Sequence, residues 1–280
     1  MREQAARRLA RGCAAGTALA LGAVLAFVLW RGAGVLRVEP PAAFLLGGRW
    51  DPPEHFGAAP FLLGSAAVAA LALALAALPA LAASLYLGRR ARPAGRLALR
   101  TVLEVMLGIP SVVYGLLGLT ALVPVVRQLG GGAGYGVASA GVLLAVMVLP
   151  TAVGVGADCW AAVPAAWEEA STALGATAWE TFRWILLPAA ARSLGGAGLL
   201  ALGRALGETM AVSMVVGNAP VAPAGLFTPT ATLTSEIALE IGAAPYGSPW
   251  SDALYALAGV LLLGAFLITW GARRLRDAPA

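Results

Sequence analysis

Residues 158–188 read DCWAAVPAAWEEASTALGATAWETFRWILLP, and they separate two long apolar segments of the chain. Pro164 suits the first turn of a helix, because its missing N–H is not needed there. Residues 167–174 can follow as two amphipathic turns. Gly175 then breaks or caps this helix. The first half of the stretch therefore predicts a short helix that ends at a glycine.

The second half of the stretch predicts another helix. Thr177 and Glu180 have the spacing of a capping box, in which each side chain bonds the backbone N–H of the other residue. Pro188 is expected to end this second helix, because proline cannot donate to the helical ladder. Residues 158–192 are therefore predicted to form a helix–glycine–helix elbow that offers a short rigid rod to a partner protein.

Outside this elbow the chain is strongly apolar. Of its 280 residues, 60% are hydrophobic and 12% are charged, whereas soluble domains average about 45–50% apolar and about 25% charged residues. Six apolar stretches are each close to or above the length that spans a bilayer. They cover residues 13–30, 61–87, 101–126, 136–157, 193–217 and 252–271. Because these stretches do not alternate in polarity as barrel strands do, we expect an all-α polytopic membrane protein that forms a single transmembrane domain over residues 1–280.

Arginine counts predict the orientation in the cell membrane. With the N-terminus in the cytoplasm, the cytoplasmic segments carry fourteen arginines and the opposite side carries four. This bias places both termini and the elbow inside, and the first span is expected to be an uncleaved signal anchor. All nineteen basic residues are arginine. A Walker A loop needs a lysine, so any ATP that drives this protein must bind to another chain.

The elbow carries a specific resemblance. Glu169-Ala170-Ser171, three residues, Gly175, nine residues and then Ile185-Leu186-Leu187-Pro188 is similar to the EAA loop of ABC importer permeases. Ser171 in place of the second alanine is the one departure. The resemblance implies that Glu169, Ala170, Gly175 and Pro188 belong to a coupling helix that docks into an ATPase subunit. An ordinary amphipathic helix at the membrane surface is the alternative.

Two charges fall inside the fifth span. Arg204 and Glu208 are four residues apart, so a continuous helix would place them on one face. Gly203 and Gly207 would let another helix approach closely. An arginine can bind a tetrahedral oxyanion through its guanidinium fork, while the glutamate could orient it or accept a hydrogen bond from a protonated phosphate. Alternatively, the pair only neutralises itself within the bundle.

Pro110 within the third span removes a helical hydrogen bond and predicts a bend. The bend is either a packing kink or a hinge that lines a pathway. In the second case Ser111 and Tyr114 would offer hydroxyl groups to a passing anion. Glu104, one turn from Arg100, could pair with that arginine.

Residues 203–218, GRALGETMAVSMVVGN, resemble the corresponding helix of phosphate-specific ABC importer permeases, in particular their C-type subunit. Glu104 followed by residues 108–115, GIPSVVYG, does so too, and the likeness covers nearly the whole chain. The N-terminal region and residues 127–135 look short for that family.

The resemblance implies a type I ABC importer permease fold and a subunit that is not itself an enzyme. Its implied partners are a homologous permease subunit, two ATPase subunits that bind ATP and Mg²⁺, and an external phosphate-binding protein. The cargo could instead be another oxyanion such as molybdate or sulfate. A stand-alone secondary transporter or channel is a further alternative. Cys13 and Cys159 have no paired spacing, so no metal site is expected.

Overall fold

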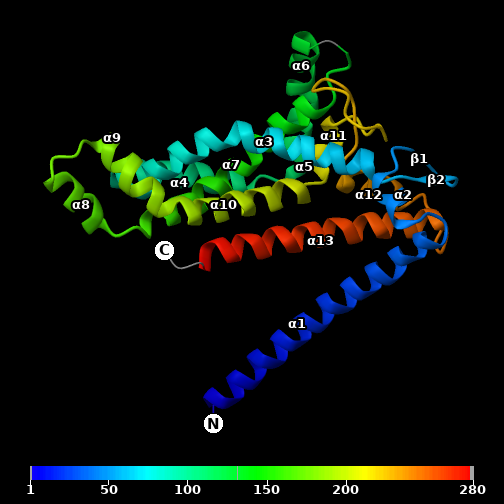
Figure 1. Cartoon of the computed structure of the whole chain (residues 1–280), viewed down its shortest axis with the longest axis horizontal. Helices are drawn as coiled ribbons and strands as arrows, with labels where there is room; N and C mark the ends of the chain where they lie inside the picture. The colour runs from blue at the N-terminus through cyan, green and yellow to red at the C-terminus, as the bar shows by residue number, and fades with distance from the viewer. Residues whose placement is uncertain (1, 131, 278–280) are drawn as a thin grey trace. The chain divides into compact units, whose positions relative to one another are not determined.

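The computed structural model describes residues 2–130 and 132–277 (Figure 1). Among these residues, six helical segments are long and apolar enough to cross a bilayer, which confirms the predicted number of spans. They are Leu9–Arg37, Ala59–Arg90, Ser111–Gly130, Val137–Ala161, Ala178–Gly207 and Pro249–Leu275. The shortest has 20 residues, about the length that a hydrocarbon core requires.

The chain, predicted to be a single domain, divides into two compact units. One unit comprises the residues up to 59 together with residues 237–263. Its secondary structure begins with α1 (Arg2–Gly32), the 3₁₀ turn η1 (Ala33–Arg37) and α2 (Pro41–Leu46). A two-stranded antiparallel hairpin follows, in which β1 (Trp50–Asp51) pairs with β2 (His55–Phe56).

An ion pair ties the end of α1 to the first turns of α13 (Pro249–Asp277). The Arg31 guanidinium lies 2.8 Å from the Asp252 carboxylate, and it also donates to the Ser251 hydroxyl at 3.1 Å. Gly32 allows this approach, because a Cβ there would lie 2.9 Å from the backbone of Ala256. Both charged side chains are largely buried, so each depends on the other for compensation of its charge.

A carboxylate organises the loops of the same unit. Glu240, the last residue of α12 (Leu233–Glu240), accepts hydrogen bonds from two indole N–H groups. Trp50 donates at 3.0 Å and Trp250 at 2.8 Å to the same oxygen. Residues 190 positions apart in sequence are therefore fixed to one another by a single side chain.

The second unit comprises residues 60–236 and the residues from 264 onward. It is built around α7 (Val137–Ala161), which packs closely against α10 (Leu187–Gly207). Small residues bring α3 (Ala59–Leu85) to the same helix, since a Cβ on Gly141 would lie 2.6 Å from Leu71. In Figure 1 these three helices run side by side. The apolar residues of α7 are buried on most of its circumference, which is why its sequence shows no polar face.

The third predicted span, residues 101–126, is not one continuous helix. The structure instead has α4 (Pro93–Gly108), then α5 (Ser111–Leu117), the π-helical turn η3 (Gly118–Leu122) and α6 (Val123–Gly130). Ile109 and Pro110 between α4 and α5 are extended, with ψ angles of 126° and 141°. Proline disfavours helical geometry in the residue before it, so the interruption includes Ile109 as well as Pro110.

The fifth predicted span, residues 193–217, also differs from the structure. Helical geometry starts at α9 (Ala178–Thr181) and continues through the π-helical turn η4 (Phe182–Leu186) into α10. Pro188 does not end this helix as predicted, because it occupies the first turn of α10, where its missing N–H is tolerated. The helix stops instead at Gly207 and resumes as α11 (Met210–Val215).

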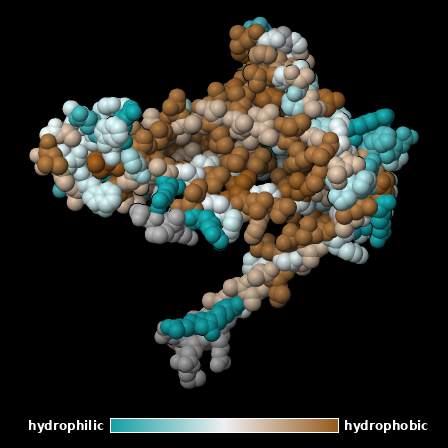
Figure 2. Space-filling model, viewed as in Figure 1, coloured by the Kyte–Doolittle hydropathy of each residue, from teal (hydrophilic) through white to brown (hydrophobic). Residues whose placement is uncertain are grey.

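On the face that Figure 2 shows, hydrophilic residues of the second unit gather at the elbow. Figure 2 shows mostly hydrophobic residues along the long helices, and hydrophilic residues around α8 (Ala165–Ala173) and α9. This distribution matches helices that are solvated by lipid along their length and by water beyond their ends.

Candidate functional site: two interrupted helices and an exposed elbow

The two helix interruptions lie against the same hydrophobic cluster. Ile109 from the first break and Leu206 from just before the second both pack on this cluster. The helices that follow the breaks also touch, because a Cβ on Gly115 of α5 would lie 3.1 Å from Cα of Ala211 in α11. Two segments about 100 residues apart in the sequence therefore form one region of broken helix.

A tyrosine side chain supplies the hydrogen bond that is missing at the first break. In a continuous helix the carbonyl of Met106 would accept from the N–H of residue 110, which is a proline and has none. The Tyr114 hydroxyl donates to this carbonyl at 2.9 Å and replaces the missing bond. Tyr114 is only 8% exposed, and its hydroxyl has this structural role in the chain, while its role as a donor to an anion stays a prediction. Ser111 is half-buried at the start of α5, and within the described residues its hydroxyl has no protein partner.

The second break separates Arg204 from Glu208. Because α10 ends at Gly207 and Glu208 is extended with ψ of 125°, the two side chains do not share a helix face as predicted. No ion pair joins them in the part of the chain that the structure describes. The Arg204 side chain is exposed, and the Glu208 carboxylate accepts a hydrogen bond from the backbone N–H of Ala211 at 3.4 Å. The prediction was wrong because it assumed an uninterrupted helix.

A buried group of hydroxyl residues supports the second break, and the sequence analysis did not identify it as part of the site. The Thr234 hydroxyl donates to the carbonyl of Glu208 at 3.0 Å. Thr232 and Ser235 bond to each other next to it, and Ser65 of α3 accepts from the N–H of Leu233. The run of residues 230–235, TATLTS, was the available signal, since so many hydroxyls between apolar segments need partners once buried.

The expected GxxxG contact of the fifth span is only partly made. A Cβ on Gly203 would lie 3.6 Å from Ile268, whereas one on Gly207 would meet nothing within 4 Å. The closest approach is at Gly196, where a Cβ would lie 3.2 Å from the carbonyl oxygen of Ala272. Gly207 therefore leaves open space directly before the break at Glu208.

The elbow has the predicted conformation. Gly175 follows α8 with a φ of +85°, a backbone conformation that favours glycine. Thr177 and Glu180 form both hydrogen bonds of the capping box at the start of α9. The Ser171 hydroxyl lies 3.0 Å from the Thr181 hydroxyl, so this departure from the motif adds a bond between α8 and α9.

Side chains from the spans hold the elbow in place. Arg90 forms an ion pair with Glu168 at 3.0 Å, and the Arg89 guanidinium donates to the carbonyl of Val163. Trp160 at the end of α7 is fully buried and donates its indole N–H to Ser84 of α3 at 3.1 Å. The base of the elbow is thus fixed to two membrane-spanning helices.

The outer face of the elbow is free of such contacts. Leu174 is 89% exposed, and Trp179 and Trp184 are also exposed. Glu169 and Ala170 of the motif are exposed as well. An open cleft of about 370 Å³ runs between α8 and Ile185. Exposed large apolar side chains around a concave surface are typical of a protein-binding site.

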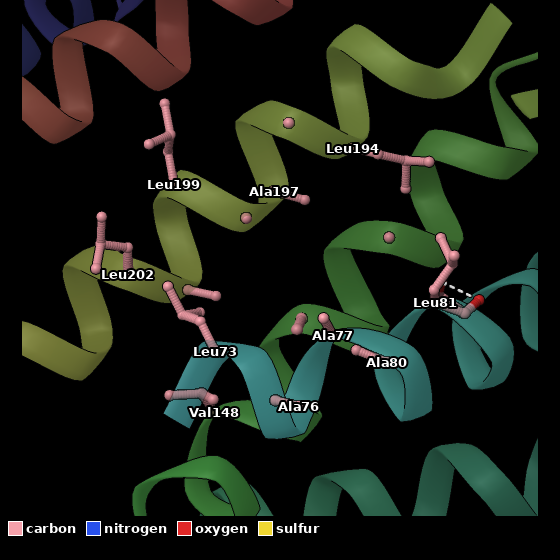
Figure 3. Close-up of a pocket in the computed structure, with 16 residues that line it drawn as sticks. Leu73, Ala76, Ala77, Ala80, Leu81, Val148, Leu194, Ala197, Leu199 and Leu202 are labelled. Atoms are coloured by element: carbon pink, nitrogen blue, oxygen red, sulfur yellow. Dashed lines mark hydrogen bonds between the residues drawn. The ribbon is translucent and has the colours of Figure 1, made fainter. Parts of the chain in front are cut away.

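A second cavity of about 370 Å³ lies among α3, α7 and α10 (Figure 3). Alanine, glycine, leucine and valine form its walls, including Ala76, Ala80 and Ala197, and Ser84 supplies the one hydroxyl. A wall without charge offers nothing to an oxyanion, so this cavity is not a candidate anion site. Within the described residues, no group of three His, Cys, Asp or Glu side chains could hold a metal ion.

Comparisons with known proteins agree with this architecture. Residues 80–277 match the family described as "Binding-protein-dependent transport system inner membrane component". The chain is 40% identical over 231 residues to the "Probable ABC transporter permease protein YqgH" of Bacillus subtilis, covering 81% of this chain and 75% of that protein.

Two further relatives are named for phosphate. The "Phosphate transport system permease protein PstC" of Haemophilus influenzae is 34% identical over 81% of this chain and 77% of its own length. The protein of that name from Xylella fastidiosa is 32% identical, with 89% and 83% covered. Among solved structures, the inward-facing MetNI methionine ABC transporter matches with a TM-score of 0.57 and 22% identity, over 80% of this chain and 95% of that chain. This chain belongs to the binding-protein-dependent transport family and is a membrane-spanning ABC importer permease with the type I fold.

Proposed function

We propose that this chain is the C-type permease subunit of an ATP-driven importer for inorganic phosphate. The observation that supports the cargo most strongly is the likeness to phosphate permeases over more than four-fifths of the chain. An exposed arginine next to the interrupted end of α10 is consistent with an anionic cargo, because a guanidinium binds tetrahedral oxyanions. We assign Arg204, Glu208 and Ser111 to the substrate pathway.

The elbow is the proposed contact with the motor. A separate ATPase subunit would bind α8 through Glu169, Ala170 and Gly175, while Pro188 begins the helix that carries the movement into the membrane. The partners would be a homologous permease subunit, two ATPase subunits with ATP and Mg²⁺, and an external phosphate-binding protein. Both termini would lie with the elbow in the cytoplasm, as the arginine distribution indicates.

Uptake of radiolabelled phosphate tests this function. The complete complex is reconstituted in proteoliposomes with ATP on the ATPase side, and uptake is compared with that of molybdate and sulfate. We expect ATP-dependent phosphate uptake that Arg204→Ala lowers by about tenfold or more, as for loss of a charged hydrogen-bond donor. Leu200→Ala, one turn earlier on α10, is the matched control. No phosphate uptake by the unaltered complex would refute the proposed cargo, and unchanged uptake by Arg204→Ala would remove Arg204 from the pathway.

A further inference from the structure

A group of charged residues on the elbow side of the first break has no role in the function described above. Arg100 and Glu104 lie one helical turn apart on α4, and together with Asp158 of α7 they line a cavity of about 230 Å³. Arg96 and Arg100 line an adjoining cavity of about 390 Å³. Arg100 therefore belongs to both. A volume of 230 Å³ corresponds to several water molecules at about 30 Å³ each, which is room for a hydrated tetrahedral anion.

These charges are not neutralised within the chain. Arg96, Arg100, Glu104 and Asp158 are all exposed, and none of them forms an ion pair in the part of the chain that the structure describes. The predicted pair between Glu104 and Arg100 is thus not formed. Their guanidinium and carboxylate groups remain available to a ligand.

The packing of α4 and the cost of burying charge in lipid argue against these side chains facing the hydrocarbon core. Leu99 and Leu103 pack against the buried cluster of α3 and α7, so α4 is held by one apolar side. None of its residues is buried in the chain alone. A charge that faces hydrocarbon costs several kcal/mol. The charged side of α4 must therefore face water, a pathway or a partner subunit, and α4 leads directly to the break at Pro110.

We propose that Arg100, Glu104 and Asp158 form a phosphate site on the elbow side of the pathway, where the anion is held before it is released. This assignment rests on the proposed phosphate cargo. The guanidinium of Arg100 would bind the phosphate oxygens, and Arg96 would draw the anion onward into the adjoining cavity. The cavity reaches from the first break toward the elbow. Leu107, close to the break, lines it, and so does Leu87, which lies just before Arg89 and Arg90, the two arginines that bind the elbow.

The carboxylates define which oxyanion fits. Inorganic phosphate near neutral pH carries at least one P–OH group, which can donate to Glu104 or Asp158. Sulfate and the phosphodiester of a lipid headgroup have no such proton, so the same carboxylates repel them. An arginine beside two carboxylates is therefore suited to free, protonated phosphate rather than to a lipid or to sulfate.

Protection of a cysteine tests the site directly. Leu107→Cys, whose side chain lines the cavity, is introduced into the complete complex with Cys13 and Cys159 replaced by serine. The rate of thiol modification is measured with inorganic phosphate, with sulfate, and in neutral versus anionic lipid. We expect phosphate to slow modification several-fold, sulfate to have little effect, and the lipid composition to make no difference.

Variants then identify the binding groups. Arg100→Gln should abolish the protection by phosphate. The double substitution Glu104→Gln with Asp158→Asn should let sulfate protect as well as phosphate does. Arg92→Gln, at the start of the same helix but in neither cavity, should behave like the unaltered complex. If anionic lipid slows the modification of the cysteine at 107 and phosphate does not, the cavity is a site for lipid headgroups and the assignment is overturned.

Uptake measured in the same preparations separates this site from the proposed function. If the complex takes up phosphate but phosphate never protects the cysteine at 107, or if Arg100→Gln behaves like Arg92→Gln, only this site is refuted. If the unaltered complex takes up no phosphate, the proposed cargo fails and this assignment fails with it.

Discussion

Replacing Gly175 by alanine tests whether the bent elbow is what the ATPase recognises. Gly175 has a φ of +85°, and a Cβ at this position would meet no atom within 4 Å. The cost of Gly175→Ala is therefore conformational and not steric, at about 1–2 kcal/mol for an L-residue in left-handed geometry. If the ATPase binds only the bent form, a cost of that size lowers the affinity by about 5–30-fold.

The assay is a titration of detergent-solubilised permease with the ATPase subunit. Gly175→Asn should bind with intermediate affinity, because asparagine tolerates left-handed geometry better than alanine does. Gly264→Ala is the matched control, since a Cβ there also meets nothing within 4 Å but lies in the regular helix α13. Equal affinities for Gly175→Ala and the unaltered permease would show that the glycine conformation is not part of the recognised surface.

Three further substitutions test the packing that supports the sites. Arg31→Ala should lower the free energy of unfolding by about 3 kcal/mol, because it leaves Asp252 unpaired. The double substitution with Asp252→Ala should recover part of this loss. Thermal unfolding in detergent measures both variants. Trp160→Phe keeps an aromatic ring but removes the indole N–H that donates to Ser84 and part of a fully buried side chain, so a loss of about 1–3 kcal/mol is expected in the same assay. No loss would contradict the role given to this bond. Thr177→Ala removes the cap of α9 at about 1 kcal/mol, which should appear as faster amide hydrogen exchange in its first turn and not in α7.

Much of the candidate site could be predicted from local sequence. Gly175 and the capping box of Thr177 and Glu180 act over a few residues, so the elbow was predicted correctly before any tertiary contact was known. Pro110 likewise predicted the first break, because proline has no N–H for the helical ladder. Proline alone does not decide a break, since Pro79 and Pro150 lie inside the continuous helices α3 and α7. The donation of Tyr114 to the Met106 carbonyl was not predicted, because it depends on the bend itself.

The sequence by itself determined six apolar spans and an elbow, because spans follow from composition and the elbow from glycine and capping chemistry. Only the tertiary structure decided that α10 stops at Gly207. Residues 205–210 contain no proline, and a helix through Glu208 was the local expectation. Thr234, 26 residues away in sequence, donates to the Glu208 carbonyl at the break and so satisfies a backbone group there. The hydroxyl run at 230–235 is visible in the sequence, but its pairing with Glu208 depends on tertiary contact, so Arg204 and Glu208 were expected on one face.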